Sequence, residues 1–143
     1  RKSSTRVERL VAKRAVFDTN VLVSAYLWTG PARRALEKAR SGEWILLNSR
    51  QTTDELIRVL AYDKFGLRAD EIQPIIEDLS DISEFVEFKT QVEIITRDPT
   101  DNIFLSLAID GQADAIVSGD HHLLDIKKFK GIPIITVRKF LAQ

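Results

Sequence analysis

The sequence predicts an α/β protein built on a parallel sheet with helices on both faces. Short apolar segments of strand length alternate along the chain with longer segments of helical periodicity. Parallel strands need long crossover connections, and these are usually helices that cover the sheet. The length of 143 residues is enough for one domain with one core. We therefore expect a basic tail or partial helix at 1–14 and a single domain at 15–143.

The first part of this domain is predicted to be a strand followed by two helices. An apolar run at 15–18 ends at Asp18 and indicates a buried strand. Helix is favoured over a continued strand at 20–27, because the polar residues that precede this segment are types that cap helices. Pro31 then starts a further helix, whose apolar residues between 32 and 39 follow the i, i+3, i+4, i+7 spacing.

The middle of the chain is predicted to contain a second strand and two more helices. The strand covers 44–47, and Ser49 is placed to cap a helix over about 50–62. A further helix over about 69–80 carries isoleucine and leucine at helical spacing. The segment 85–95 favours β structure, but its register stays open.

The last third of the chain is predicted to begin with a buried helix. Asp98 is expected to cap it, with Pro99 at the first position and Asp101 at the third. Its body, 103–109, is apolar almost all round, which is typical of a central helix. The remaining predicted elements are strands at 114–117 and 132–136 and a short helix at 137–142.

Charge is distributed unevenly along a chain whose formal net charge is zero. Lysine and arginine gather in 1–14, in 33–40 and between 127 and 139, whereas 70–93 is mostly acidic. Basic segments of this kind can contact phosphates. Ordinary solvated helix faces explain each segment equally well, so the charge pattern alone does not identify a partner.

The composition limits the chemistry that the chain can perform. It has no cysteine, which excludes disulfides, thiolate zinc sites and a cysteine nucleophile. With two histidines, carboxylate oxygens must dominate any metal site, and such ligands suit Mg²⁺, Mn²⁺ or Ca²⁺. Glycine-rich nucleotide-binding loops and a serine-hydrolase elbow are absent from the sequence. No apolar run of bilayer length and no secretory signal occur, so we expect a cytoplasmic protein without a membrane partner.

Four acids lie on four separate predicted elements, at or near the same end of the sheet. Asp18 and Asp120 each follow an apolar strand, and open parallel sheets bind ligands outside such carboxyl ends. Glu55 lies in the first turns of one helix and Asp101 near the start of another. Taken singly, each acid is also explained as a helix cap or as a charge near a helix N-terminus.

Taken together, the four carboxylates predict a metal site. Without a counterion, such a cluster would repel itself and raise its own pKa values. A divalent cation removes that repulsion. Carboxylate clusters that hold one or two such ions are common machinery for phosphodiester hydrolysis.

The acids stand in a sequence pattern that resembles the PIN-domain family. Its parts are Phe17-Asp18-Thr19-Asn20-Val21-Leu22, Glu55-Leu56, Asp98-Pro99-Thr100-Asp101-Asn102, and Ser118-Gly119-Asp120 with Leu123-Leu124. The resemblance extends over 15–141, nearly the whole chain. It is greatest to the small prokaryotic single-domain members, which are assigned as toxins of toxin–antitoxin systems.

This resemblance implies a three-layer α/β/α sandwich around a central, mainly parallel sheet, the Rossmann-like PIN fold. It also implies Mg²⁺- or Mn²⁺-dependent ribonuclease activity, with catalytic and metal-binding roles for Asp18, Glu55, Asp101 and Asp120. The supporting polar positions of the family fall on Asn20, Ser118 and Asn102. The last of these stands where members often have a second acid, so the number of ions, one or two, stays open.

We therefore predict a divalent-metal-dependent endoribonuclease that hydrolyses RNA phosphodiester bonds and acts as the toxin of a toxin–antitoxin pair. Its expected partners are RNA, a cognate antitoxin and a second copy in a homodimer. Contacts with RNA phosphates are predicted at Arg33, Arg50, Arg97 and Lys127. The alternatives are a non-catalytic PIN module that binds RNA or a partner, and a DNA nuclease.

Overall fold

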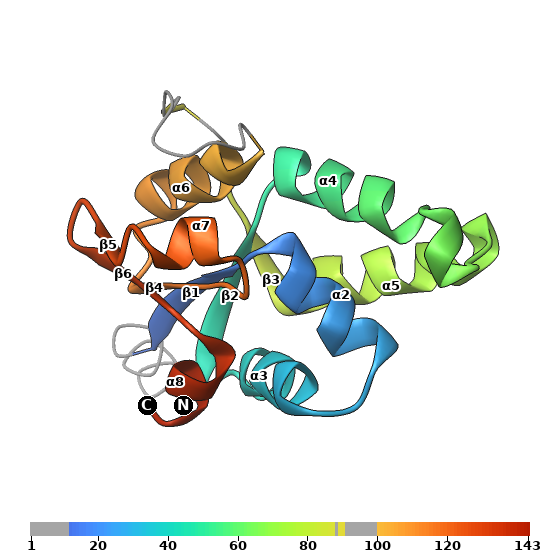
Figure 1. Ribbon diagram of the computed structural model, residues 1–143, viewed down its shortest axis with the longest axis horizontal. Helices are drawn as coiled ribbons and strands as arrows, with labels where there is room; N and C mark the ends of the chain where they lie inside the picture. The colour runs from blue at the N-terminus through green and yellow to red at the C-terminus, as the bar shows by residue number, and fades with distance from the viewer. Residues whose placement is uncertain (1–11, 88, 91–99) are drawn as a thin grey trace, which may run out of the picture.

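The computed structural model describes residues 12–87, 89–90 and 100–143, and in these residues six strands form one sheet (Figure 1). The strands are β1 (Lys13–Phe17), β2 (Trp44–Asn48), β3 (Ser83–Phe85), β4 (Ala115–Val117), β5 (Lys128–Phe129) and β6 (Ile132–Ile135). Their order across the sheet is β3-β2-β1-β4-β6-β5. Neighbours from β3 to β6 run parallel, and β5 pairs antiparallel with β6 at the edge. The predicted, mainly parallel sheet is confirmed.

Helices connect the strands and cover the sheet. They are α2 (Thr19–Leu27), α3 (Pro31–Arg40), α4 (Arg50–Leu60), α5 (Ala69–Ile82), α6 (Asp101–Asp110), α7 (His121–Leu124) and α8 (Val137–Leu141), with a 3₁₀ turn, η1 (Asp63–Phe65). Within the described ranges, none of these helices has the length and apolar character needed to cross a membrane.

The core has two parts, one on each face of the sheet. Ala15 and Phe17 of β1 pack with apolar residues of α2, α3, α4, α5 and α8, whereas Val16 packs with those of α6 and α7. This division follows from the two-residue period of a strand, which turns alternate side chains to opposite faces. Figure 1 shows α6 and α7 on one side of the sheet and α3 and α8 on the other. The three-layer α/β/α architecture is therefore confirmed.

The register of β1 against β4 places the candidate site. Phe17 lies opposite Val117 in this parallel pair, and the backbone N–H of Asp18 donates to the carbonyl of Val117 at 3.0 Å. The residues that follow these strand ends, Asp18 and Ser118, are therefore neighbours at one edge of the sheet.

Helix ends follow the residue types that the sequence places there. Ser49 caps α4, and its hydroxyl accepts a hydrogen bond from the Thr52 N–H at 3.1 Å while Thr52 Oγ1 accepts one from the Ser49 N–H at 3.0 Å. Pro31 is the first residue of α3, where its missing N–H leaves no hydrogen bond unmade. Both starts agree with the prediction.

Several boundaries differ from the prediction. The first strand begins at Lys13, two residues early, because its pairing with β2 extends to that residue. The helix predicted to reach residue 62 ends at Leu60 and is followed by η1. The β structure expected from residue 85 lies instead at Ser83–Phe85, and 91–95 are outside the described residues.

The start of α6 also differs from the prediction. Thr100 is its cap and Asp101 its first residue, so Asp101 is at the first helical position and not at the third. Asp98, the predicted cap, lies outside the described residues. The helix body is buried as predicted, and Phe104, Leu105 and Leu107 belong to the core.

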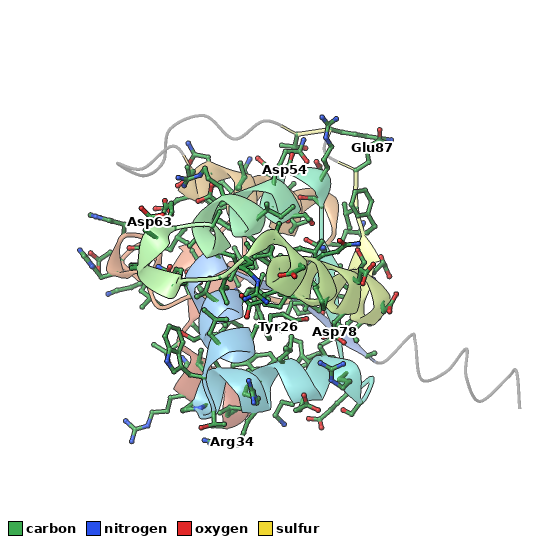
Figure 2. All side chains as sticks on the ribbon, turned by 90° about the vertical axis from the view of Figure 1, so that its right-hand side faces the viewer. Tyr26, Arg34, Asp54, Asp63, Asp78 and Glu87 are labelled. Carbon is green, nitrogen blue, oxygen red and sulfur yellow. The ribbon has the colours of Figure 1, made fainter. Side chains whose placement is uncertain are left out.

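A polar network joins three helices on the face that carries α2, α3 and α5. Figure 2 shows Tyr26 of α2 beside Asp78 of α5. The Tyr26 hydroxyl donates to Asp78 Oδ2 at 2.8 Å, and the Arg40 guanidinium donates to both oxygens of Asp78 at 2.7 and 2.8 Å. Hydrogen bonds from Arg40 hold the pKa of Asp78 below its usual value. This network stabilises the packing of the helices and lies away from the strand ends.

Candidate functional site

The four predicted acids line one cleft at the carboxyl ends of β1 and β4. The cleft has a volume of about 280 Å³. Asp18 directly follows β1, Asp120 lies between β4 and α7, Glu55 is on α4 and Asp101 begins α6. The fold therefore brings together four carboxylates that are far apart in the sequence, as predicted for the cluster.

Asp18 serves as a helix cap and as part of the cleft at the same time. It is 4% exposed, and its Oδ1 accepts a hydrogen bond from the Val21 N–H at 2.9 Å, which caps α2. Its Oδ2 accepts a short hydrogen bond from the Ser118 hydroxyl. The role of Asp18 as a helix cap therefore does not exclude a role in the cleft, because a carboxylate has two oxygens that can accept hydrogen bonds separately.

Ser118 connects the first and the last acid. The residue is fully buried, and while its hydroxyl donates to Asp18 it accepts a hydrogen bond from the Asp120 N–H at 2.9 Å. Asp120 in turn caps α7, because its Oδ1 accepts from the His122 N–H at 2.8 Å. One serine thus fixes the Asp18 carboxylate and the turn that carries Asp120.

Glu55 is paired with an arginine of its own helix. Arg58 donates from Nε to Glu55 Oε1 at 3.0 Å and from Nη2 to Oε2 at 2.8 Å. The remaining nitrogen of the same guanidinium also forms a hydrogen bond, because Nη1 donates to the Tyr62 hydroxyl at 2.7 Å. Both residues line the cleft, where the Glu55 side chain is 13% exposed and the Arg58 side chain is 55% exposed. The ionic partner of Glu55 therefore comes from the protein itself.

Burial changes the acidity of the site. Desolvation raises the pKa of the Asp18 carboxyl, and the negative charge of Asp120 raises it further. Hydrogen bonds from Ser118 and from the backbone at Val21 and Gly119 lower the pKa in part, but the net direction is upward. Asp101, at 5% exposed, is buried beside the same cleft. Two buried carboxyls at one cleft favour the approach of a cation.

Comparison with protein families identifies the family to which the fold belongs. Residues 14–122 match the family model of the PIN domain, and the match includes all four acids of the cleft. The chain belongs to the PIN-domain family. PIN domains are generally nucleases that use divalent metal ions. Among curated proteins, none matches this PIN domain.

Two solved structures resemble this PIN domain. PAE2754 from Pyrobaculum aerophilum is 16% identical, with a TM-score of 0.58 over 92% of this chain and 91% of that one. VapBC2 from Rickettsia felis was solved bound to a DNA fragment from its promoter. It is 16% identical, with a TM-score of 0.60 over 86% of this chain and 98% of that one. At this level of identity the likeness establishes the shared fold.

The donors of the PIN cleft fit a hard divalent cation in their chemistry. All four acids supply oxygens, and Thr19 adds a buried hydroxyl oxygen with no hydrogen-bond partner among the described residues. As they stand, no three Asp, Glu or His side chains of the described ranges are grouped so that they could hold one ion. Asp18 is engaged by Ser118, and Glu55 by Arg58. Binding of one ion by three of these acids would therefore require their side chains to move closer together.

The supporting residues predicted from the sequence have three different positions. Asn20 is exposed and lines the cleft. Ser118 lies beneath it and bonds two of the acids. Asn102 does not line the cleft, and its buried Oδ1 has no hydrogen-bond partner among the described residues.

Of the arginines and lysine predicted to contact phosphates, those that the structure describes do not line the cleft. Arg33 donates to the carbonyls of Ala25 and Tyr26 at 3.1 Å each, which uses its guanidinium at the end of α2. Arg50 has a side chain that is 85% exposed, and Lys127 lies in the turn before β5. Arg97 is outside the described residues.

Sequence reasoning missed the cations and rings that do line the cleft: Arg58, Tyr62, Lys64 and Phe65. Part of the signal was available in the helical period. Arg58 and Tyr62 follow Glu55 by three and seven residues, which places them on the same side of a helix. Lys64 and Phe65 depend on η1, which the sequence did not predict.

Proposed function

We propose that this PIN domain is an endoribonuclease that depends on a divalent metal ion and hydrolyses RNA phosphodiester bonds. The observation that supports it best is the convergence of four carboxylates, from four separate elements, on one cleft at the carboxyl ends of the strands. Asp18 and Asp101 are buried at this cleft, and carboxylates gathered at one place repel one another unless a cation offsets their charge.

The acids divide the work in this proposal. Asp18, Asp101 and Asp120 would hold the metal ion directly, and Glu55 would hold it directly or through a water molecule. Mg²⁺ or Mn²⁺, when bound, supplies activation of the attacking water and offsets charge on the phosphate. Ser118 keeps the Asp18 carboxylate oriented.

The test is cleavage of single-stranded RNA and of DNA with the same sequence, each with Mg²⁺, Mn²⁺ or EDTA. The matched variant is Asp18→Asn, which keeps an oxygen to cap α2 but loses the charge. The proposal expects cleavage of RNA by the parent with metal, and none with EDTA or with Asp18→Asn. Cleavage with EDTA, or equal activity of the variant, would overturn it. Preferential cleavage of DNA would favour the DNA nuclease. The absence of any cleavage would favour the non-catalytic binding module.

We further propose that the protein is the toxin of a toxin–antitoxin pair and acts on RNA in the cytoplasm. Its structural likeness to VapBC2 supports a cognate antitoxin as a partner. Induced expression of the parent is expected to arrest growth, with Asp18→Asn as the harmless control. Unchanged growth with an active parent enzyme would contradict the toxin role and leave the nuclease in place. A homodimer is expected as well, and light scattering at several protein concentrations tests it.

A further inference from the structure

One wall of the cleft carries cations and aromatic rings where the others carry acids. The end of α4 contributes Arg58 and the segment through η1 contributes Tyr62, Lys64 and Phe65. We call these four residues the aromatic–cationic rim. Cations repel metal ions, so the rim suits an anionic ligand better than a metal ion.

The Tyr62 side chain is exposed at this rim, and its orientation is fixed. The residue is 39% exposed, and its hydroxyl accepts a hydrogen bond from Arg58 Nη1 at 2.7 Å. The Arg58 guanidinium carbon lies 5.5 Å from the centroid of the ring. Arg58 is itself held by two hydrogen bonds to Glu55. A ring fixed in this way loses little conformational freedom when a planar group stacks on it.

Lys64 is the rim cation whose charge is available to a ligand. Its Nζ lies 5.1 Å from the centroid of the Phe65 ring, and it forms no ion pair with any residue that the structure describes. The charge of Arg58, in contrast, is balanced by Glu55. Lys64 lines the same cleft as the exposed Tyr62 ring. Proteins hold single-stranded nucleic acid with such a combination, a cation for the phosphates and an exposed ring for a base.

We propose that the rim binds one unpaired nucleotide of the RNA beside the scissile phosphate. Its base stacks on the Tyr62 ring and its phosphate contacts Lys64. This inference rests on the proposed function and specifies its substrate as single-stranded. In a duplex the faces of each base are covered by neighbouring pairs, so the ring has no partner there.

The test measures binding of a short labelled single-stranded RNA in EDTA by fluorescence anisotropy, so that binding does not depend on cleavage. Tyr62→Leu should raise Kd about tenfold, whereas Tyr62→Phe, which keeps the ring, should stay within about twofold of the parent. Lys64→Gln should reduce the slope of log Kd against log salt concentration by about 0.7. The same RNA annealed to its complement should bind the parent and Tyr62→Leu alike.

The controls are Phe85→Leu and Lys139→Gln, an exposed ring and an exposed lysine that do not line the cleft. Thermal unfolding confirms that each variant folds. Parent-like binding by Tyr62→Leu, or an equal loss with Phe85→Leu, would overturn the inference. If the parent cleaves RNA and Tyr62→Leu binds and cleaves it equally well, the inference is overturned and the proposed function stands. A protein that binds RNA through Tyr62 but cleaves nothing contradicts the proposed function alone.

Discussion

Arg58 donates two hydrogen bonds to the carboxylate of Glu55, three residues before it on α4, at 3.0 and 2.8 Å. Paired donors of this kind match the two oxygens of a carboxylate and give a well-oriented ion pair. The pair neutralises one of the four acids of the cleft and directs the remaining donor of Arg58 to Tyr62. It therefore links the acidic wall of the cleft to the aromatic–cationic rim.

Removal of this arginine should strengthen metal binding. Arg58→Gln frees both oxygens of Glu55 and returns a negative charge to the cleft, so the affinity for Mn²⁺ should rise about two- to fivefold. Isothermal titration calorimetry measures it, with Arg34→Gln as a control that removes an arginine of α3 outside the cleft. Weaker binding by Arg58→Gln would mean that the arginine positions Glu55 for the ion and does not compete with it.

Metal ions should stabilise the folded parent, because a ligand that binds only the folded state raises Tm. At a Mn²⁺ concentration of about 100 times Kd, the gain is about 2.7 kcal/mol, which corresponds to roughly 5–10 °C for a chain of this size. Asp120→Asn can still cap α7 but lacks the charge, so most of this shift should disappear. Differential scanning fluorimetry with and without Mn²⁺ measures both. An equal shift in the variant would place the ion elsewhere.

The network of Tyr26, Arg40 and Asp78 should make stability depend on pH. The pKa of Asp78 is lowered in the folded protein, so its stabilising effect is present above the unfolded value and is lost as pH falls through the folded value. Asp78→Asn should lower the free energy of unfolding by about 1 kcal/mol at neutral pH, a figure that allows for solvent screening of a side chain one-third exposed. Urea unfolding at pH 7 and at about pH 3 measures it.

The difference between parent and Asp78→Asn should narrow at the lower pH, because the stabilising effect of the Asp78 charge diminishes once pH falls below the unfolded value. Asp81→Asn, on the same helix, removes a carboxylate outside this network and serves as the control. A difference that stayed constant from pH 7 to about pH 3 would show that the Asp78 charge does not stabilise the helices.

Gly111 lies where the end of α6 meets the sheet, and a side chain there should destabilise the fold. A Cβ at this position would lie 2.6 Å from Leu47 Cδ1 and 3.0 Å from the carbonyl oxygen of Leu107. Gly111→Ala should therefore lower the free energy of unfolding by about 1–3 kcal/mol. At Gly119 a Cβ would meet nothing within 4 Å, which makes Gly119→Ala the matched control. Chemical denaturation measures the free energy of unfolding of both variants. Equal values would contradict the close packing of Gly111 against Leu47.

Much of the fold could be predicted because buried strands and amphipathic helices have strong periodic signals. The acids at Asp18 and Asp120 were found for the same reason: a strand end locates the residue that follows it. Periodic signals do not predict the irregular parts of the chain. The two-residue strand β5 and the turn η1 are too short to produce a periodic signal.

The cations that line the cleft could not be predicted from the sequence, because charge alone does not locate a side chain. Arg33 lies in a charged helical segment that resembles the one containing Arg58, and Arg50 is on the same helix as Arg58. Only the packing of α4 against the strand ends decides which guanidinium reaches the acids. The hydrogen bond from Ser118 to Asp18 depends in the same way on the β1–β4 register, which no local pattern reveals.

The most direct test of the central claim is the rate of RNA cleavage by variants that each lose one cleft carboxylate. Asp18→Asn, Glu55→Gln, Asp101→Asn and Asp120→Asn should each lower the single-turnover rate in Mn²⁺ by about a hundredfold or more. Asp54→Asn and Asp63→Asn, two exposed acids of the same region outside the cleft (Figure 2), should cleave like the parent. Parent-like rates in the four cleft variants, or equal losses in the two controls, would contradict the claim that these four acids form the active site.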